Sequence, residues 1–259
     1  RVMGSQRCVL SRVGVVMPHE RGYVPHRNSH RGQCIGKTWP MRITLPSGTP
    51  AEIDTSVPSP AMGLVIAPDI WSLRPLYDDM VARLAREWNM AVCAVEPFPG
   101  RTIPQEMEPR MAAVPTLDDA SHLRDLHEAA DALGTSRVGL MGFCLGGMYC
   151  FKSAVSPRFA RIASFYGMIR VPVPWRSATQ REPLQLLAEG DARKVLAIIG
   201  TNDPYTPPND VIALRELGVN VVEYEGAEHA FAHDPSRPAH RKDDAADAFA
   251  RSRAWLMGE

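Results

Sequence analysis

The feature that most constrains the fold is a glycine-flanked cysteine, Cys144, in the hexapeptide Gly-Phe-Cys-Leu-Gly-Gly. An apolar run at 138–141 precedes this hexapeptide, and a helix-compatible run at 148–155 follows it. A strand that turns sharply into a helix strains its central residue and needs small residues two positions before and two after, here Gly142 and Gly146. The helix N-terminus would favour a thiolate. The pattern predicts a nucleophilic cysteine, with a buried structural cysteine as the alternative.

Two further polar residues follow β-like runs later in the chain. Asp203 comes after the apolar run 195–199, and His229 comes after the run 221–224. A free thiol is mostly protonated near neutral pH, so an imidazole must accept its proton, and a carboxylate must orient that imidazole. Alone, either residue is an ordinary loop or turn residue. The order nucleophile, acid, base is typical of α/β-hydrolases and predicts a catalytic triad of Cys144, Asp203 and His229.

From about Met41 to its C-terminus the chain resembles the dienelactone hydrolase family (carboxymethylenebutenolidases and relatives) of the α/β-hydrolase superfamily. The cysteine is the specific element, because most of the superfamily carries serine at that position. The resemblance rests on these motifs: Gly-Phe-Cys-Leu-Gly-Gly at 142–147, Phe165-Tyr166-Gly167, Gly200-Thr201-Asn202-Asp203 with Pro207, Glu228-His229-Ala230-Phe231, and Val65-Ile66-Ala67-Pro68-Asp69-Ile70.

The resemblance implies an acidic residue that faces the cysteine and modulates its ionisation. The family usually has glutamate there, whereas this chain has Asp69, which is one methylene shorter. A cap or turn aspartate is the alternative interpretation. The resemblance also implies an oxyanion hole built from the backbone N–H groups of Leu145 and Ile70.

Dienelactone-type substrates carry a free carboxylate, which the family members that process them hold with arginines. Arg101, Arg110 and Arg237 are the candidate equivalents in this chain. Where some members have an arginine four residues past the catalytic histidine, this chain has His233. We also assign Tyr166, His233, Arg110 and Arg237 as candidate substrate-binding residues.

Apolar runs alternate with helix-like stretches along the rest of the chain. Continuous apolar strands separated by amphipathic helices predict a mainly parallel sheet with helices on both faces, a three-layer αβα arrangement. We expect one α/β-hydrolase domain over 41–259, a length that suits a single large domain. The expected strands are 62–67, 90–95, 138–142, 162–166, 195–200 and 220–224, with a first strand at 41–45, and the expected helices are 76–88, 117–133, 210–217 and 239–257.

Residues 1–40 differ in charge from the rest of the chain. They contain seven basic residues against Glu20 alone, a balance of +6, so the formally neutral chain carries −6 over 41–259. They are also polar and lack periodicity. We expect a disordered extension or an upstream segment outside the fold; an arm that binds nucleic acid is the alternative, but aromatic residues are nearly absent from it.

Two motif-like patterns within the extension do not support a ligand site. His26, His30 and Cys34 are spaced four residues apart, which is weak support for zinc. The run 32–38 is one residue short of a phosphate loop and has no strand before it. We therefore expect neither a metal nor a cofactor.

The five cysteines are odd in number and without paired spacing, which argues against a disulfide framework. Cys93 and Cys150 are interpreted as structural. No apolar stretch approaches the ~20 residues of a membrane span, and no signal-peptide core is recognised. We expect a cytoplasmic monomer or small homo-oligomer that binds neither membrane nor nucleic acid.

The predicted function is a cysteine-dependent hydrolase of a small ester or lactone, acting through an acyl-enzyme without a cofactor. Three alternatives remain open at this point. A general short-chain carboxylesterase or thioesterase would use the same residues, and a thiol-based acyltransferase or redox-responsive protein would use the same cysteine. A binding protein without catalysis would not need a complete triad.

Overall fold

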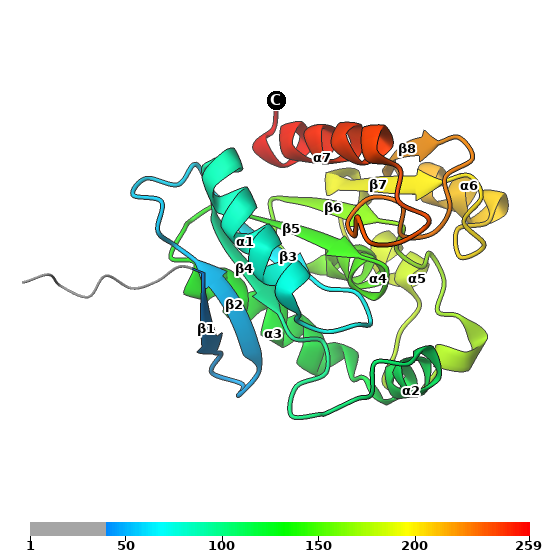
Figure 1. Cartoon of the computed structure of the whole chain (residues 1–259). Coiled ribbons are helices and arrows are strands. Elements are labelled where there is room, and N and C mark those ends of the chain that lie inside the picture. The colour runs from blue at the N-terminus through cyan, green and yellow to red at the C-terminus, as the bar shows by residue number, and fades with distance from the viewer. Residues whose placement is uncertain (1–39) are drawn as a thin grey trace, which may run out of the picture. The chain divides into compact units, whose positions relative to one another are not determined.

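The computed structural model describes residues 40–259 of the chain. They form an eight-stranded sheet in the order β1-β2-β4-β3-β5-β6-β7-β8. The first two strands are antiparallel to their neighbours, and all other pairs are parallel (Figure 1). The strands are β1 (Met41–Thr44), β2 (Pro50–Asp54), β3 (Gly63–Ala67), β4 (Ala91–Val95), β5 (Val138–Phe143), β6 (Arg161–Phe165), β7 (Val195–Gly200) and β8 (Asn220–Tyr224).

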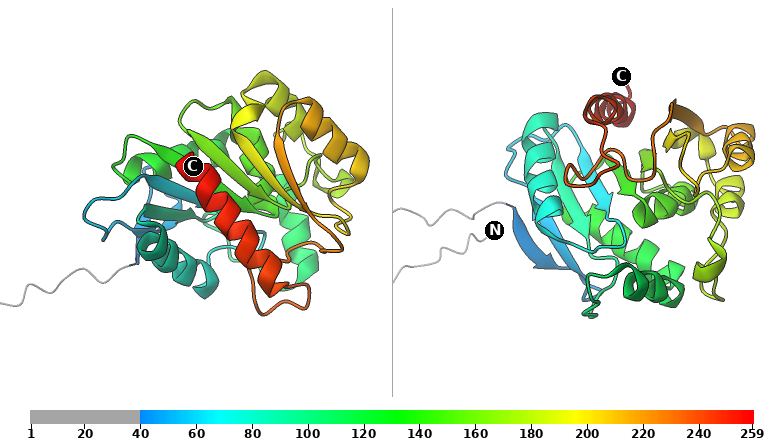
Figure 2. Two further views of the ribbon diagram at one scale, coloured as in Figure 1. Left: turned by 90° about the horizontal axis from the view of Figure 1, so that it is seen from above. Right: turned by 45° about the vertical axis from the view of Figure 1, so that its right-hand side comes forward.

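Helices cover both faces of this sheet. Two of them, α1 and α7, lie on one face, and α3 and α4 lie on the other (Figure 2). The α-helices are α1 (Pro75–Trp88), α2 (Met107–Ala113), α3 (Asp119–Ala132), α4 (Leu145–Lys152), α5 (Pro183–Glu189), α6 (Pro208–Glu216) and α7 (Lys242–Met257). The predicted fold class, a mainly parallel sheet in an αβα arrangement, is confirmed.

The central strands form the core of this domain. Every residue of β3, β4, β5 and β7 is buried, as expected for parallel strands that are covered on both faces. Glycine lets helices approach the sheet closely: a Cβ on Gly147 of α4 would lie 2.7 Å from the Cα of Gly167. This close packing fixes the positions of the C-terminal ends of the strands.

Five neighbouring parallel strands, β3, β5, β6, β7 and β8, end at the same edge of the sheet. Each is followed by a loop or turn that contains a predicted site residue: Asp69, Cys144, Tyr166, Asp203 or His229. Ligand sites of α/β sheets lie at the carboxyl ends of the strands. The topology thus brings these segments, which are far apart in the sequence, to one place.

Some predictions fall on the first 39 residues, outside the part that the structure describes. These are the basic extension and the spacing of His26, His30 and Cys34. Within residues 40–259, no helix has the length and apolar character required to span a bilayer.

Candidate active site

Cys144 lies at the turn between β5 and α4, in a strained conformation with φ 55° and ψ −114°. The turn is closed so tightly that flanking side chains would collide. A Cβ on Gly142 would lie 2.3 Å from the carbonyl oxygen of Gly146, and a Cβ on Gly146 would lie 1.9 Å from that of Ala67. Cys144 is 8% exposed. The hexapeptide therefore forms the elbow that its glycines predict.

Asp203 and His229 are joined by a hydrogen bond. The Nδ1 of His229 lies 2.7 Å from Oδ2 of Asp203, whose Oδ1 accepts the backbone N–H of Tyr205 at 2.9 Å. Asp203 is buried. The other ring nitrogen of His229, Nε2, is buried and has no hydrogen-bond partner within residues 40–259. Both His229 and Cys144 line one cavity.

The charge state of His229 follows from these neighbours. Burial alone would lower the pKa of His229, but the negative charge of a Cys144 thiolate and the bond to Asp203 raise this pKa to about 10. The imidazole is then protonated at neutral pH. A positive charge beside a cysteine favours the thiolate over the thiol.

Leu145 and Ile70 are the two residues expected to supply the backbone donors of an oxyanion hole. Leu145 is the first residue of α4, where N–H groups lack helical partners, and Ile70 follows Asp69 on the cavity wall. Within the described residues neither N–H group donates a hydrogen bond. Both groups remain available to a developing oxyanion.

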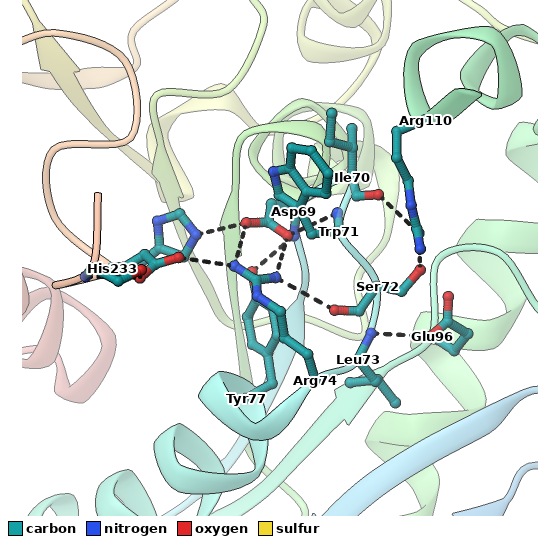
Figure 3. A network of polar contacts seen from close by, with 12 residues as sticks. Asp69, Ile70, Trp71, Ser72, Leu73, Arg74, Tyr77, Glu96, Arg110 and His233 are labelled. Atoms are coloured by element: carbon teal, nitrogen blue, oxygen red, sulfur yellow. Dashed lines mark hydrogen bonds and ion pairs between the residues drawn. The ribbon is translucent and has the colours of Figure 1, made fainter. Parts of the chain in front are cut away.

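Asp69 lies on the same cavity wall, but its carboxylate is directed to other partners (Figure 3). Oδ1 accepts from Arg74 at 2.7 Å and from the N–H of Trp71 at 3.0 Å; Oδ2 bonds Arg74 at 3.0 Å and Nε2 of His233 at 2.8 Å. Within residues 40–259 no hydrogen bond joins Asp69 to Cys144. The carboxylate of Asp69 is therefore occupied by Arg74, Trp71 and His233 rather than by the thiol.

The cavity is small, with a volume of about 70 Å³. Its walls are largely apolar, which suits a small organic ligand fixed by few polar groups. The lining residues are Asp69, Ile70, Trp71, Met107, Met111, Cys144, Met168, Trp175, Tyr205, His229, Ala230, His233 and Arg237.

The candidate substrate-binding residues separate into two groups. Arg237 and His233 line the cavity, and Arg237 forms no ion pair with another described residue. Tyr166 is fully buried behind the wall, with its hydroxyl 2.6 Å from Nδ1 of His233. The structure does not bring Arg110 or Arg101 to this cavity.

Arg110 is buried and holds backbone instead. Its guanidinium donates to the carbonyl oxygens of Ile70 at 3.2 Å, Ile103 at 2.7 Å and Pro104 at 2.9 Å, and to the hydroxyl of Ser72 at 2.6 Å. These four contacts direct the guanidinium N–H groups to acceptors within the protein. Arg110 thus braces the segment that carries the Ile70 N–H, which is a different task from binding a substrate carboxylate.

Sequence reasoning missed Arg74 and most of the apolar wall. Arg74 directly precedes the proline that opens α1 and belongs to no motif. Met107 and Met111 come from α2, a short helix with weak sequence signals. Trp175 comes from the short 3-10 helix Val173–Trp175 after β6. Within residues 40–259, no cluster of three or more His, Cys, Asp or Glu is arranged to hold a metal ion.

Comparisons with known proteins identify the family of this chain. The sequence model of the dienelactone hydrolase family matches residues 50–258. A Bradyrhizobium protein assigned as a 2-oxo-3-(5-oxofuran-2-ylidene)propanoate lactonase is 26% identical over 215 residues, covering 74% of this chain and 82% of the relative. Carboxymethylenebutenolidase 2 of Cupriavidus pinatubonensis is 24% identical over 206 residues, covering 75% and 82%.

Solved structures share the fold. A crystal structure from Klebsiella pneumoniae, of a protein assigned as a dienelactone hydrolase, has a TM-score of 0.75 and 22% identity, covering 85% of this chain and 98% of that one. A dienelactone hydrolase-like promiscuous phosphotriesterase from metagenomic libraries has a TM-score of 0.64 and 20% identity, covering 84% and 97%. The family model covers most of the chain, so the expected membership is confirmed: this carboxylic-ester hydrolase belongs to the dienelactone hydrolase family.

Proposed function

We propose that the chain hydrolyses a small ester or lactone through a thioester intermediate on Cys144. The observation that carries the proposal is the joint position of Cys144 and His229. The cysteine lies at the strained elbow, and His229 Nε2 is buried without a partner beside the same cavity. A buried imidazole nitrogen without a hydrogen-bond partner is uncommon and calls for an explanation, which proton transfer at this cavity would supply.

The proposed reaction has two steps. In the first, the Cys144 thiolate attacks the carbonyl carbon, and the N–H groups of Leu145 and Ile70 receive the negative charge on oxygen. The C–O bond breaks as His229 gives its proton to the leaving oxygen, which in a lactone stays attached to the acyl group. In the second, His229 takes a proton from water, the hydroxide attacks the thioester, and the thiolate leaves with its electron pair.

The substrate that fits best is small and carries a carboxylate. A cavity of about 70 Å³ favours a compact acyl group. Arg237, which has no ion-pair partner among the described residues, supplies a positive charge to the cavity wall. The negative charge of Asp69 on the same wall is neutralised by its ion pair with Arg74. Because this chemistry needs a reduced Cys144, we assign the enzyme to a reducing compartment such as the cytoplasm.

The test is to trap the intermediate. Wild type mixed with a p-nitrophenyl ester should gain the mass of one acyl group, located at Cys144 by peptide mapping. Cys144→Ala should neither turn over the ester nor acquire the acyl group, and Cys144→Ser should retain little activity because a hydroxyl is far harder to ionise. Cys150→Ala, which changes another buried cysteine in α4, is the matched control. Full activity in Cys144→Ala would rule out the mechanism.

Two further assays separate the remaining activities. Added alcohol or thiol tests acyl transfer, because a transferase would form the new ester faster than the free acid. A panel of acidic lactones, neutral esters and thioesters of similar size tests the general esterase alternative.

A further inference from the structure

A second histidine–carboxylate pair lies beside the proposed triad. His233 bonds Oδ2 of Asp69 through Nε2 at 2.8 Å, and its Nδ1 lies 2.6 Å from the hydroxyl of Tyr166. All three side chains are buried. The imidazole therefore has a partner on each nitrogen, unlike His229.

The donor of each bond can be assigned from charge. Burial alone would raise the pKa of Asp69, but His233 and Arg74 lower it well below its usual range, so this carboxylate is ionised and only accepts. Nε2 of His233 must then carry a proton. Arg74 pairs with both oxygens of this carboxylate as well. Burial raises the pKa of Tyr166, so its hydroxyl keeps its proton and can donate to Nδ1 of His233 at 2.6 Å.

These bonds connect three segments of the site. Asp69 precedes Ile70, the proposed oxyanion donor. His233 lies four residues after His229, in the same loop between β8 and α7. Tyr166, at the end of β6, has a φ of 40°, a conformation that a bulky residue adopts only when its surroundings hold it. Its ring meets the ring of His229 edge-on, with centroids 5.3 Å apart.

The loop that contains Ile70 is held from two other sides as well (Figure 3). Arg110 bonds the carbonyl oxygen of Ile70 and the hydroxyl of Ser72, and Glu96 accepts the N–H of Leu73 at 3.0 Å. Figure 3 shows His233 approaching Asp69 from the side opposite Arg110. His233 is thus the link from this loop to the loop of the proposed base.

We infer that His233 is a positioning residue: with Asp69 and Tyr166 it holds the loop that contains Ile70 in the geometry that the thioester reaction requires. The inference rests on the proposed function. His233 neither exchanges a proton with substrate nor holds its carboxylate. Its effect is on the rate of acyl-enzyme formation, because a displaced oxyanion donor stabilises the transition state less while substrate binding changes little.

Two amide variants separate the two hydrogen bonds of His233, because each variant keeps only one of them. The amide of His233→Asn overlaps Nδ1 and keeps the Tyr166 contact, whereas the amide of His233→Gln reaches the Nε2 position and keeps Asp69. Since a whole oxyanion donor is worth roughly 10²–10³ in kcat, we expect His233→Asn to lower kcat at least about tenfold with KM within about twofold. His233→Gln should match Tyr166→Phe, and their double variant should be no worse than either, because both remove one contact.

A second readout excludes simple unfolding and damage to the triad. Iodoacetamide alkylates Cys144 without forming an oxyanion, so its rate and pH profile should stay within about twofold of wild type in every His233 variant. Kinetic constants are normalised to the fraction of Cys144 that is alkylated at the wild-type rate, because unfolded chains react at the slower rate of an ordinary thiol. His127→Gln, on α3, is the control histidine.

Each result has a defined meaning. Wild-type kcat in His233→Asn would overturn the inference, and so would an alkylation rate that falls in parallel with kcat. Additive losses in the double variant would overturn the shared role of Tyr166. Failure of the proposed function is a separate outcome, seen as ester turnover that survives Cys144→Ala.

Discussion

His229 turns its Nδ1 toward Asp203, 2.7 Å from Oδ2, and leaves Nε2 buried and unbonded beside the cavity of Cys144. Under the proposed mechanism, a thiolate at Cys144 is the largest influence that raises the pKa of this imidazole, to about 10. We therefore expect the Cε1–H resonance of His229 to titrate near pH 10 in wild type. In Cys144→Ala, where that charge is absent, the pKa should fall toward its ordinary value of 6.5. Cys150→Ala should leave it unchanged, and an unchanged pKa in Cys144→Ala would contradict the ion pair.

Arg237 should determine how the enzyme responds to substrate charge. The net charge of −6 over 41–259 repels anions at long range, so a preference for them needs a local cation. We expect wild type to prefer acidic lactones to neutral esters of equal size. Arg237→Gln should reduce that preference by roughly ten- to 150-fold, since a hydrogen bond to a charged group contributes about 1.5–3 kcal/mol.

Arg101→Gln is the matched control for this experiment, because Arg101 is exposed and outside the cavity. Specificity constants for the two substrate classes give the comparison directly. A wild-type preference for neutral esters would remove the carboxylate from the proposed substrate and favour a general esterase. If the preference survived in Arg237→Gln, the anion would bind elsewhere.

The sequence could predict what local pattern determines. The strands expected at 138–142 and 195–200 lie within one residue of β5 and β7, because continuous apolar runs bounded by turns have few other solutions. The glycines around Cys144 indicated the elbow, because any larger side chain at those positions would clash across the turn. The sequence placed Asp203 and His229 after two β-like runs, and the structure shows a hydrogen bond between them.

The rest of the site depends on contacts between distant segments. β2 was not expected, because Pro50-Ala51-Glu52-Ile53-Asp54 carries acidic residues and becomes a strand by pairing with β1 and β4. The tasks of Arg110 and Asp69 depend on which groups lie beside them once the loops have folded. Residue type alone suggests a substrate anchor for a buried arginine, whereas the fold gives Arg110 four partners in the chain itself.

Lys152, at the end of α4, should contribute to stability through Asp119 on α3. Its Nζ lies 2.8 Å and 3.0 Å from the two carboxylate oxygens of Asp119, and Lys152 is fully buried. Lys152→Met leaves a buried charge without its partner, which typically costs about 3–5 kcal/mol. Adding Asp119→Asn removes that charge but keeps an acceptor for the N–H of Arg181. We expect urea unfolding to show a large loss in the single variant and partial recovery in the double. A loss below about 1 kcal/mol in Lys152→Met would contradict this.

His122, on α3, should make the protein less stable in mild acid. Burial, with a smaller effect from the charge of Lys152, lowers its pKa from 6.5 to about 3. Above pH 6.5 the imidazole is neutral in both the folded and unfolded states and contributes no pH dependence. Between pH 3 and 6.5 the unfolded state binds a proton that the folded state does not. The free energy of unfolding should therefore fall as the pH is lowered, by up to about 1.4 kcal/mol per pH unit from this group.

The comparison is between wild type and His122→Gln, unfolded in urea at several pH values from 7.5 down to 4.5. Carboxylates titrate over part of this range in both proteins, so the difference between the two curves isolates His122. Loss of the buried ring destabilises the variant by a constant amount at every pH, which shifts its curve without changing the slope. We expect the two curves to be parallel above pH 7 and to converge below pH 6.5, because only wild type retains the acid-sensitive histidine. Curves that stay parallel down to pH 4.5 would show that the folded protein accepts the proton on His122 as readily as the unfolded chain does.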